Sequence, residues 1–70
     1  MNLDIRSHII NNFKGDNKEA LQSAIEESIQ NNDEITLPGM GVFFELVWKN
    51  AKQETKDEIL SILESSVKAE

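Results

Sequence analysis

The sequence has no cysteine, one proline, one histidine and three glycines among its 70 residues. Without cysteine the chain forms neither a disulfide framework nor a thiolate metal site. It also lacks any apolar run near the roughly 20 residues that a helix needs to span a bilayer, and no basic and apolar leader follows Met1. We therefore expect no membrane contact and a location in the cytoplasm of the compartment that makes the protein.

Basic residues are scarce as well. Seven Lys and Arg residues stand against thirteen Asp and Glu residues, which gives a net charge of −6. The excess is concentrated in residues 16–34, where one lysine accompanies six acidic residues. Because nucleic-acid binding usually depends on clustered basic side chains that neutralise phosphates, this charge pattern disfavours DNA binding.

The length allows one small domain, residues 1–70. A chain of this size buries only about 60% of its unfolded surface, so we expect modest stability. The hydrophobic share of 39%, with 29% charged residues, is typical of a folded domain rather than a disordered tail. The partner is unknown at this point, and both self-association and contact with another protein stay open as sources of further stability.

The most apolar stretch runs from residue 37 to residue 51 and holds three of the four aromatic residues. At helical spacing the apolar side chains of this stretch fall into one stripe, formed by Met40, Phe43, Phe44, Val47, Trp48 and Ala51. We predict a helix over residues 41–51. Such a helix should be the central one.

The residues just before this helix predict a turn. Pro38 disfavours helical backbone at Leu37, and Gly39 and Gly41 permit unusual backbone angles. We therefore predict a Pro-Gly-x-Gly turn in which at least one glycine has a positive φ. Residues 34–37 alternate polar and apolar, which leaves a short strand open there.

The apolar spacing as a whole predicts an all-α fold, a compact four-helix single domain with helices at roughly 2–14, 17–31, 41–51 and 55–68. Asp16 or Asn17 should begin the second helix, and Thr55 with Glu58 forms a capping box at the start of the fourth. The predicted core comprises Leu3, Ile10, Phe13, Leu21, Ile25, Ile29, Leu37, Phe43, Phe44, Val47, Trp48, Ile59, Leu63 and Val67.

Few residues of the sequence suggest acid–base catalysis or metal binding. His8 has no neighbouring cysteine or second histidine. Glu26 and Glu27 are adjacent, so they do not face one another as a catalytic pair does. Glu19 and Glu26 are one heptad apart and can share a face of the helix. We expect this face to be a solvated acidic surface.

The sequence gives equally little evidence for phosphate binding or nucleophilic catalysis. Gly39 and Gly41 lack the third glycine, or the Gly-Lys-Ser/Thr sequence, of phosphate-binding loops. Ser61, Ser65 and Ser66 have no evident base. We therefore expect no catalytic residue, no cofactor-binding residue, no metal ligand, no cofactor and no enzymatic activity.

The sequence Leu-Pro-Gly-x-Gly-Val-x-Phe-Glu-x-x-Trp-Lys-Asn-Ala, read from Leu37 to Ala51, resembles the signature of the small acid-soluble spore protein I family of spore-forming Firmicutes. The resemblance extends outward to Asn2, Leu3 and Arg6 and to the flanking helices. It implies a non-enzymatic minor protein of the spore core, made in the forespore cytoplasm and associated with sporulation, with no defined molecular activity.

A second resemblance provides an alternative function. A helix followed by Glu-x-x-Leu-Pro-Gly-x-Gly-x-Phe, here from Glu34 to Phe43, is similar to the entry to the sheet of the bacterial histone-like DNA-binding family. This implies a small nucleic-acid architectural module. The basic β-arm that inserts into the minor groove in that family has no counterpart here, so the acidic charge pattern favours the spore protein.

Overall fold

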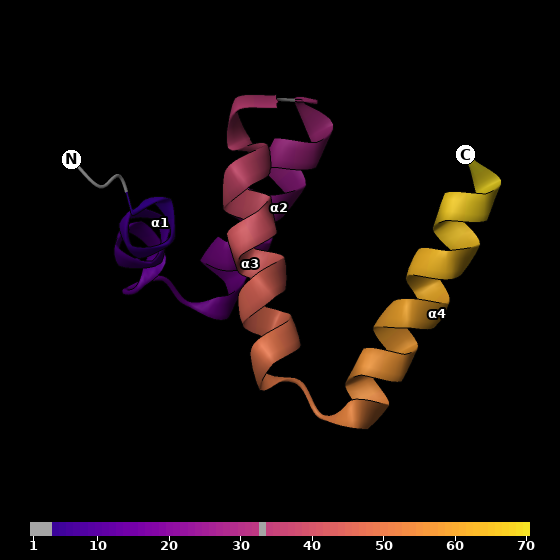
Figure 1. The fold of residues 1–70 in the computed structure, drawn as a ribbon. Coiled ribbons are helices and arrows are strands. Elements are labelled where there is room, and N and C mark those ends of the chain that lie inside the picture. The colour runs from indigo at the N-terminus through magenta and orange to yellow at the C-terminus, as the bar shows by residue number, and fades with distance from the viewer. Residues whose placement is uncertain (1–3, 33) are drawn as a thin grey trace.

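The computed structural model describes residues 4–32 and 34–70, which form four α-helices and one 3₁₀ turn (Figure 1). The helices are α1 (Ile5–Phe13), α2 (Lys18–Gln30), α3 (Leu37–Asn50) and α4 (Gln53–Ala69), and the 3₁₀ turn η1 spans Glu34–Thr36. These residues contain no strand. The all-α prediction with four helices is confirmed.

Side chains cap the first two helices. The Asp4 carboxylate accepts hydrogen bonds from the Ser7 backbone N–H at 3.2 Å and from the Ser7 hydroxyl at 2.7 Å, which fixes the start of α1. The Asn17 side-chain oxygen accepts from the Ala20 N–H at 2.9 Å. Of the two residues predicted to begin the second helix, Asn17 is the cap.

The capping box predicted for the fourth helix is wrong. α4 begins at Gln53, so Thr55 and Glu58 lie inside it, and Lys52 occupies the cap position without a side-chain hydrogen bond. Ala51 and Lys52 both have extended backbone and form the whole link from α3. Because the link is only two residues long, α4 begins at Gln53, and Thr55 lies too far along the helix to cap it.

α3 begins at Leu37, four residues earlier than predicted, so Pro38, Gly39 and Gly41 lie within the helix. Proline is tolerated there because the first turn of a helix has no partner for its missing N–H. Neither glycine has a positive φ, so that prediction is also wrong. The residues considered for a strand form η1 and the first residue of α3 instead.

The positive φ found in the described residues outside glycine belongs to Asn32, at 53°. This residue follows α2 in the turn that ends the helix. Asparagine adopts left-handed backbone more readily than most residues, so this turn forms with Asn32 and does not require a glycine.

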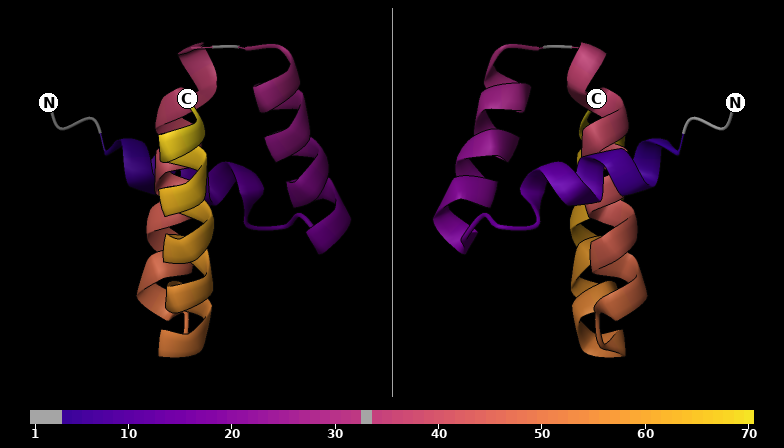
Figure 2. Two further views of the ribbon diagram at one scale, coloured as in Figure 1. Left: turned by 90° about the vertical axis from the view of Figure 1, so that its right-hand side faces the viewer. Right: turned by 90° about the vertical axis from the view of Figure 1, so that its left-hand side faces the viewer.

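α3 is the centre of the arrangement. α1 crosses α3 on one side and α4 lies on the other, as the two views of Figure 2 show together with Figure 1. α1 contacts α3 through the Phe13 and Phe43 rings, whose centroids lie 5.0 Å apart at 80°. α4 turns back along α3 and diverges from it toward the C-terminus (Figure 1).

The core is smaller than predicted. Among the described residues the buried hydrophobic side chain is Val42, 7% exposed, which the predicted core omitted. Half-buried members of the predicted core are Phe13, Leu21, Ile25, Phe43, Trp48 and Ile59. Exposed members are Ile10, Ile29, Leu37, Phe44, Val47, Leu63 and Val67. Leu3 lies outside the described residues. The divergence of α4 from α3 leaves the apolar stripes of these two helices partly uncovered (Figure 1), and Ile10 on α1 and Ile29 on α2 are exposed as well.

Candidate functional site

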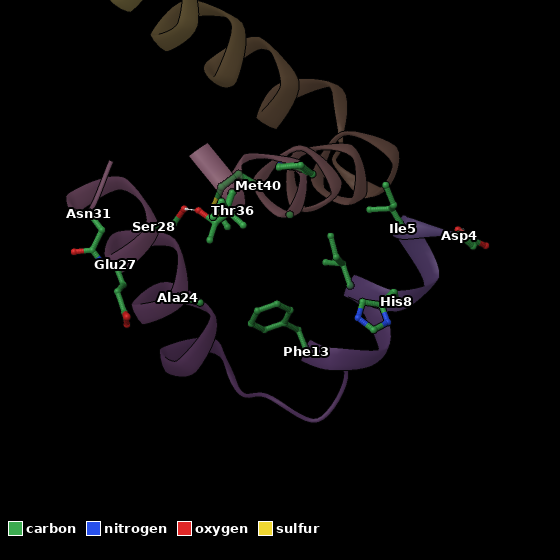
Figure 3. A pocket seen from close by; sticks show the side chains of 14 residues that line it. Asp4, Ile5, His8, Phe13, Ala24, Glu27, Ser28, Asn31, Thr36 and Met40 are labelled. Carbon is green, nitrogen blue, oxygen red and sulfur yellow. Dashed lines mark hydrogen bonds between the residues drawn. The ribbon is translucent and has the colours of Figure 1, made fainter. Parts of the chain in front are cut away.

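A groove lies between α1, α2 and the start of α3, and we call it the interhelical groove (Figure 3). Its volume is about 760 Å³. It is lined by Asp4, Ile5, His8, Ile9, Phe13, Ala24, Glu27, Ser28, Asn31, Ile35, Thr36, Pro38, Gly39 and Met40. The groove is a concave and mainly apolar surface of the kind that accepts a small molecule or an apolar side chain.

The walls of the groove follow from helical spacing. Ile5, Ile9 and Phe13 occur every fourth residue on α1 and therefore share one face. Ala24 and Ser28 do the same on α2, but their side chains are too short to reach across. The Ser28 and Thr36 hydroxyls share a hydrogen bond, which ties α2 to η1 and keeps the opposite wall in place.

The polar groups of the groove are far from forming a catalytic pair. His8 and Glu27 lie on opposite sides with the Phe13 ring between them (Figure 3). Asp4 is engaged in capping α1, and the hydrogen bond from the Ser7 hydroxyl lowers the pKa of its carboxyl below the ordinary value. A general base must lie within hydrogen-bond distance of the proton that it removes. The groove is instead an apolar site with polar groups at its edges.

The candidates from the sequence are dispersed over the structure. His8, Glu27 and Gly39 contribute to the interhelical groove. Glu19 lies in the first turn of α2, and Glu26 accepts a hydrogen bond from Gln22 at 3.1 Å. The exposed serines of α4 and Gly41 lie elsewhere on the molecule: Ser61, Ser65, Ser66 and Gly41.

Within residues 4–32 and 34–70, no group of three or more His, Cys, Asp or Glu side chains is arranged to hold a metal ion. None of the helices in these ranges has the length and apolar character needed to cross a membrane.

One ion pair links α1 to α3. The Arg6 guanidinium donates two hydrogen bonds to Glu45, Nε to Oε1 at 2.7 Å and Nη2 to Oε2 at 3.0 Å. The hydrogen bond from Arg6 lowers the pKa of Glu45 and raises the pKa of Arg6. Lys49 lies 3.8 Å from the same carboxylate, one helical turn along α3.

A second surface is apolar and lies on the facing sides of α3 and α4, which diverge from one another (Figure 1), and we call it the hairpin face. Its members occur at helical spacing along the two helices and are exposed or half-buried: Leu37, Phe44 and Trp48 on α3, and Leu60, Leu63 and Val67 on α4.

The two halves of the hairpin face meet at one end. The Trp48 ring stacks on Phe44 with centroids 6.0 Å apart, and the Lys56 ammonium lies 5.2 Å from the Trp48 ring. Lys56 thereby provides a cation–π contact between the helices. Since Lys56 shares a stripe with Leu60, Leu63 and Val67, the apolar side of α4 is turned toward α3.

Comparison with known proteins gives a consistent result along the chain. The family model described as "Small, acid-soluble spore protein I" matches residues 3–67. A protein of that name from Geobacillus kaustophilus is 43% identical over 68 residues, which cover 97% of this chain and 99% of that protein. The Bacillus subtilis protein of the same name is 41% identical over 68 residues, covering 97% of this chain and 96% of the relative. No solved structure matches the chain.

Proposed function

Because this chain belongs to the small, acid-soluble spore protein I family, we propose that it is a non-enzymatic protein of the spore core, made in the forespore and acting through binding rather than catalysis. The observation that carries the proposal is the match over residues 3–67, nearly the whole chain. The relatives are named as spore proteins, so an association with sporulation follows from the family alone.

The environment of the polar groups supports a role without catalysis. In the described part of the chain, the two carboxylates with lowered pKa values perform structural tasks, Asp4 as the cap of α1 and Glu45 as the partner of Arg6. Perturbed pKa values mark functional sites only when the groups converge in a cleft. Asp4 is at the edge of the groove and Glu45 does not line it.

The basic side chains support a role without DNA coating. Four of the seven basic residues have contacts inside the chain: Arg6 and Lys49 with Glu45, Lys68 with Glu64, and Lys56 with Trp48. Affinity for duplex DNA grows with the number of phosphates that basic residues neutralise. These four basic groups belong to three different helices, α1, α3 and α4, which argues against a single phosphate-binding surface.

A titration of labelled duplex DNA with the purified protein tests this part of the proposal. At about 150 mM salt, where specific binders reach dissociation constants near 10⁻⁸ M, we expect no saturable change in fluorescence anisotropy. A parallel titration at low salt is the control for non-specific electrostatic binding. Saturable binding at the higher salt would favour the architectural module instead.

The location is tested in sporulating cells. We expect a fluorescent fusion to accumulate in the forespore and to stay with the spore core after the outer layers are stripped. A fusion to one of the known core proteins provides the matched control. Accumulation in the mother cell would contradict the proposed location.

A further inference from the structure

The chain exposes more surface than a folded monomer of its mass. Its accessible surface is 6213 Å², whereas the scaling of folded monomers gives about 4,400 Å² for a mass of 7.9 kDa. The excess is about 1,800 Å². A standard protein interface buries only about 800 Å² on each partner, so the excess is sufficient for a stable dimer.

Exposed apolar side chains of the hairpin face contribute to this excess. Every residue from 60 to 70 is exposed. Leu63 is 48% exposed and Val67 is 64% exposed on α4, while Phe44 is 48% and Leu37 is 60% exposed on α3. The contact of Lys56 with Trp48 aligns the two apolar stripes at the closed end of the hairpin, and the helices diverge beyond it (Figure 1).

We propose that two copies of this chain form a dimer through their hairpin faces, with the two α4 helices antiparallel about a two-fold axis. Each copy then covers the apolar stripe that the other leaves exposed, and the four helices α3 and α4 of the two copies share one core. A two-fold interface places the same surface of each copy against the other, so the apolar stripes of one copy meet those of its partner.

The charges of α4 argue for a second copy and for the antiparallel orientation. On the side of α4 that carries the apolar stripe, helical spacing places Lys52 and Lys56 at its start and Glu64 and Glu70 at its end. Asp57 lies at the margin of the stripe, and Glu64 also lies 3.4 Å from Lys68 of the same helix. Antiparallel pairing brings the lysines of one copy toward the glutamates of its partner, and the two-fold axis repeats the pairing. A parallel arrangement would place like charges together.

Other occupants fit this surface less well. Residues 53–69 hold four acidic residues and two lysines, so the polar side of α4 lacks the basic character that draws amphipathic helices to membranes. The same acidic excess disfavours nucleic acid. The inference goes beyond the proposed function, and a monomeric protein would leave the proposed spore-core role as it stands.

Sedimentation velocity on the 70-residue chain tests the dimer. Between about 1 and 200 μM we expect a transition from a 7.9 kDa species to one of twice that mass. A mass of 7.9 kDa throughout this range would overturn the proposal.

A matched pair of variants tests the surface. Leu63→Asp places a charge in the hairpin face and should weaken dimerisation by roughly tenfold or more, because an unpaired charge would be buried. Ser61→Asp makes the same charge on the other side of α4 and should leave dimerisation unchanged. Circular dichroism verifies that both variants keep their helices, which the exposure of both positions predicts. Equal dimerisation by both variants would exclude the hairpin face as the interface.

The orientation is tested by crosslinking, for which the absence of native cysteine is an advantage. Gln53→Cys and Glu70→Cys place single thiols at the two ends of α4, on the side of the helix that carries the apolar stripe. We expect oxidation of a mixture to give the heterodimer of the two variants. Efficient disulfide formation by each variant with itself would show a parallel arrangement and overturn the antiparallel one.

Discussion

Gly41 lies in the interior of α3 with helical backbone, and a methyl group there would meet no atom within 4 Å. Glycine in a helix interior costs about 0.5 to 1 kcal/mol relative to alanine, since the unfolded chain loses more freedom. We therefore expect Gly41→Ala to stabilise the protein by about that amount, measured as a higher urea midpoint.

Gly39→Ala is the matched comparison in the same helix. Its new methyl group would lie 3.7 Å from Ile9 Cδ1, an ordinary contact, so a similar gain is expected. A lower midpoint for Gly41→Ala would show that α3 requires bare backbone at this position.

The Arg6–Glu45 ion pair predicts a specific dependence on pH. The pKa of Glu45 is lowered from its ordinary value of 4.5, chiefly by the hydrogen bond from Arg6. The folded state therefore gains stability above the ordinary value and loses it as the pH falls through the lowered pKa. Glu45→Gln should reduce stability near neutral pH and change it little in acid.

Urea midpoints at about pH 7 and about pH 3 make this comparison. Glu64→Gln is the control, because it alters an exposed pair with Lys68 within one helix. Equal losses for Glu45→Gln at both pH values would show that the carboxylate charge does not contribute.

At this scale, helical spacing accounts for contacts between near neighbours but not for those between distant residues. The Glu45–Lys49 and Glu64–Lys68 pairs follow from helical spacing and are both present. Arg6 lies 39 residues from Glu45, so no local pattern connects them. The interhelical groove was missed for the same reason, although the four-residue spacing of Ile5, Ile9 and Phe13 was available as a signal for one wall.

At the scale of elements, the cap of α2 provides the clearest test. Asn17→Ala removes the acceptor of the Ala20 N–H and should destabilise the protein by about 1 kcal/mol. Asp16→Ala changes the neighbouring residue, which the sequence made an equal candidate, and should have a smaller effect. Chemical denaturation of both variants decides, and the reverse order of losses would assign the cap to Asp16.

The helices themselves were predictable because their apolar periodicity and caps are local. The residues at which the helices begin and end were less predictable. Pro38 was expected to exclude helix at Leu37, yet the preference against helix before proline is weak when the proline stands in the first turn. The Thr36 hydroxyl bonds to Ser28 and provides no cap for α3, so the start of this helix is set by a contact from α2 that the sequence does not reveal.

At the scale of the whole molecule, the error lay in the core. The stripes on α2 and α4 were read as buried, but periodicity shows only which side of a helix is apolar and not what covers it. Ile29 and Val67 are therefore correctly placed on apolar stripes and yet 69% and 64% exposed. Val42 was missed because it lies on the side of α3 away from Trp48.

Unequal burial predicts unequal local stability. In dilute, monomeric protein the amides of residues 60–69 should exchange with solvent faster than those of residues 42–49, because opening the end of α4 exposes little further apolar surface. Hydrogen exchange followed by mass spectrometry measures this difference. Equal protection of the two segments would mean that α4 opens only when the whole molecule unfolds.

Both carboxylates with lowered pKa values hold the same helix, since Asp4 caps α1 and Glu45 binds it through Arg6. Strong acid protonates both and also leaves the chain with eight cationic side chains, which favours solubility. α1 supplies Ile5, Ile9 and Phe13 to the interhelical groove. We therefore expect acid to weaken the contacts that hold α1 at the groove, so a ligand of the groove is best sought at neutral pH.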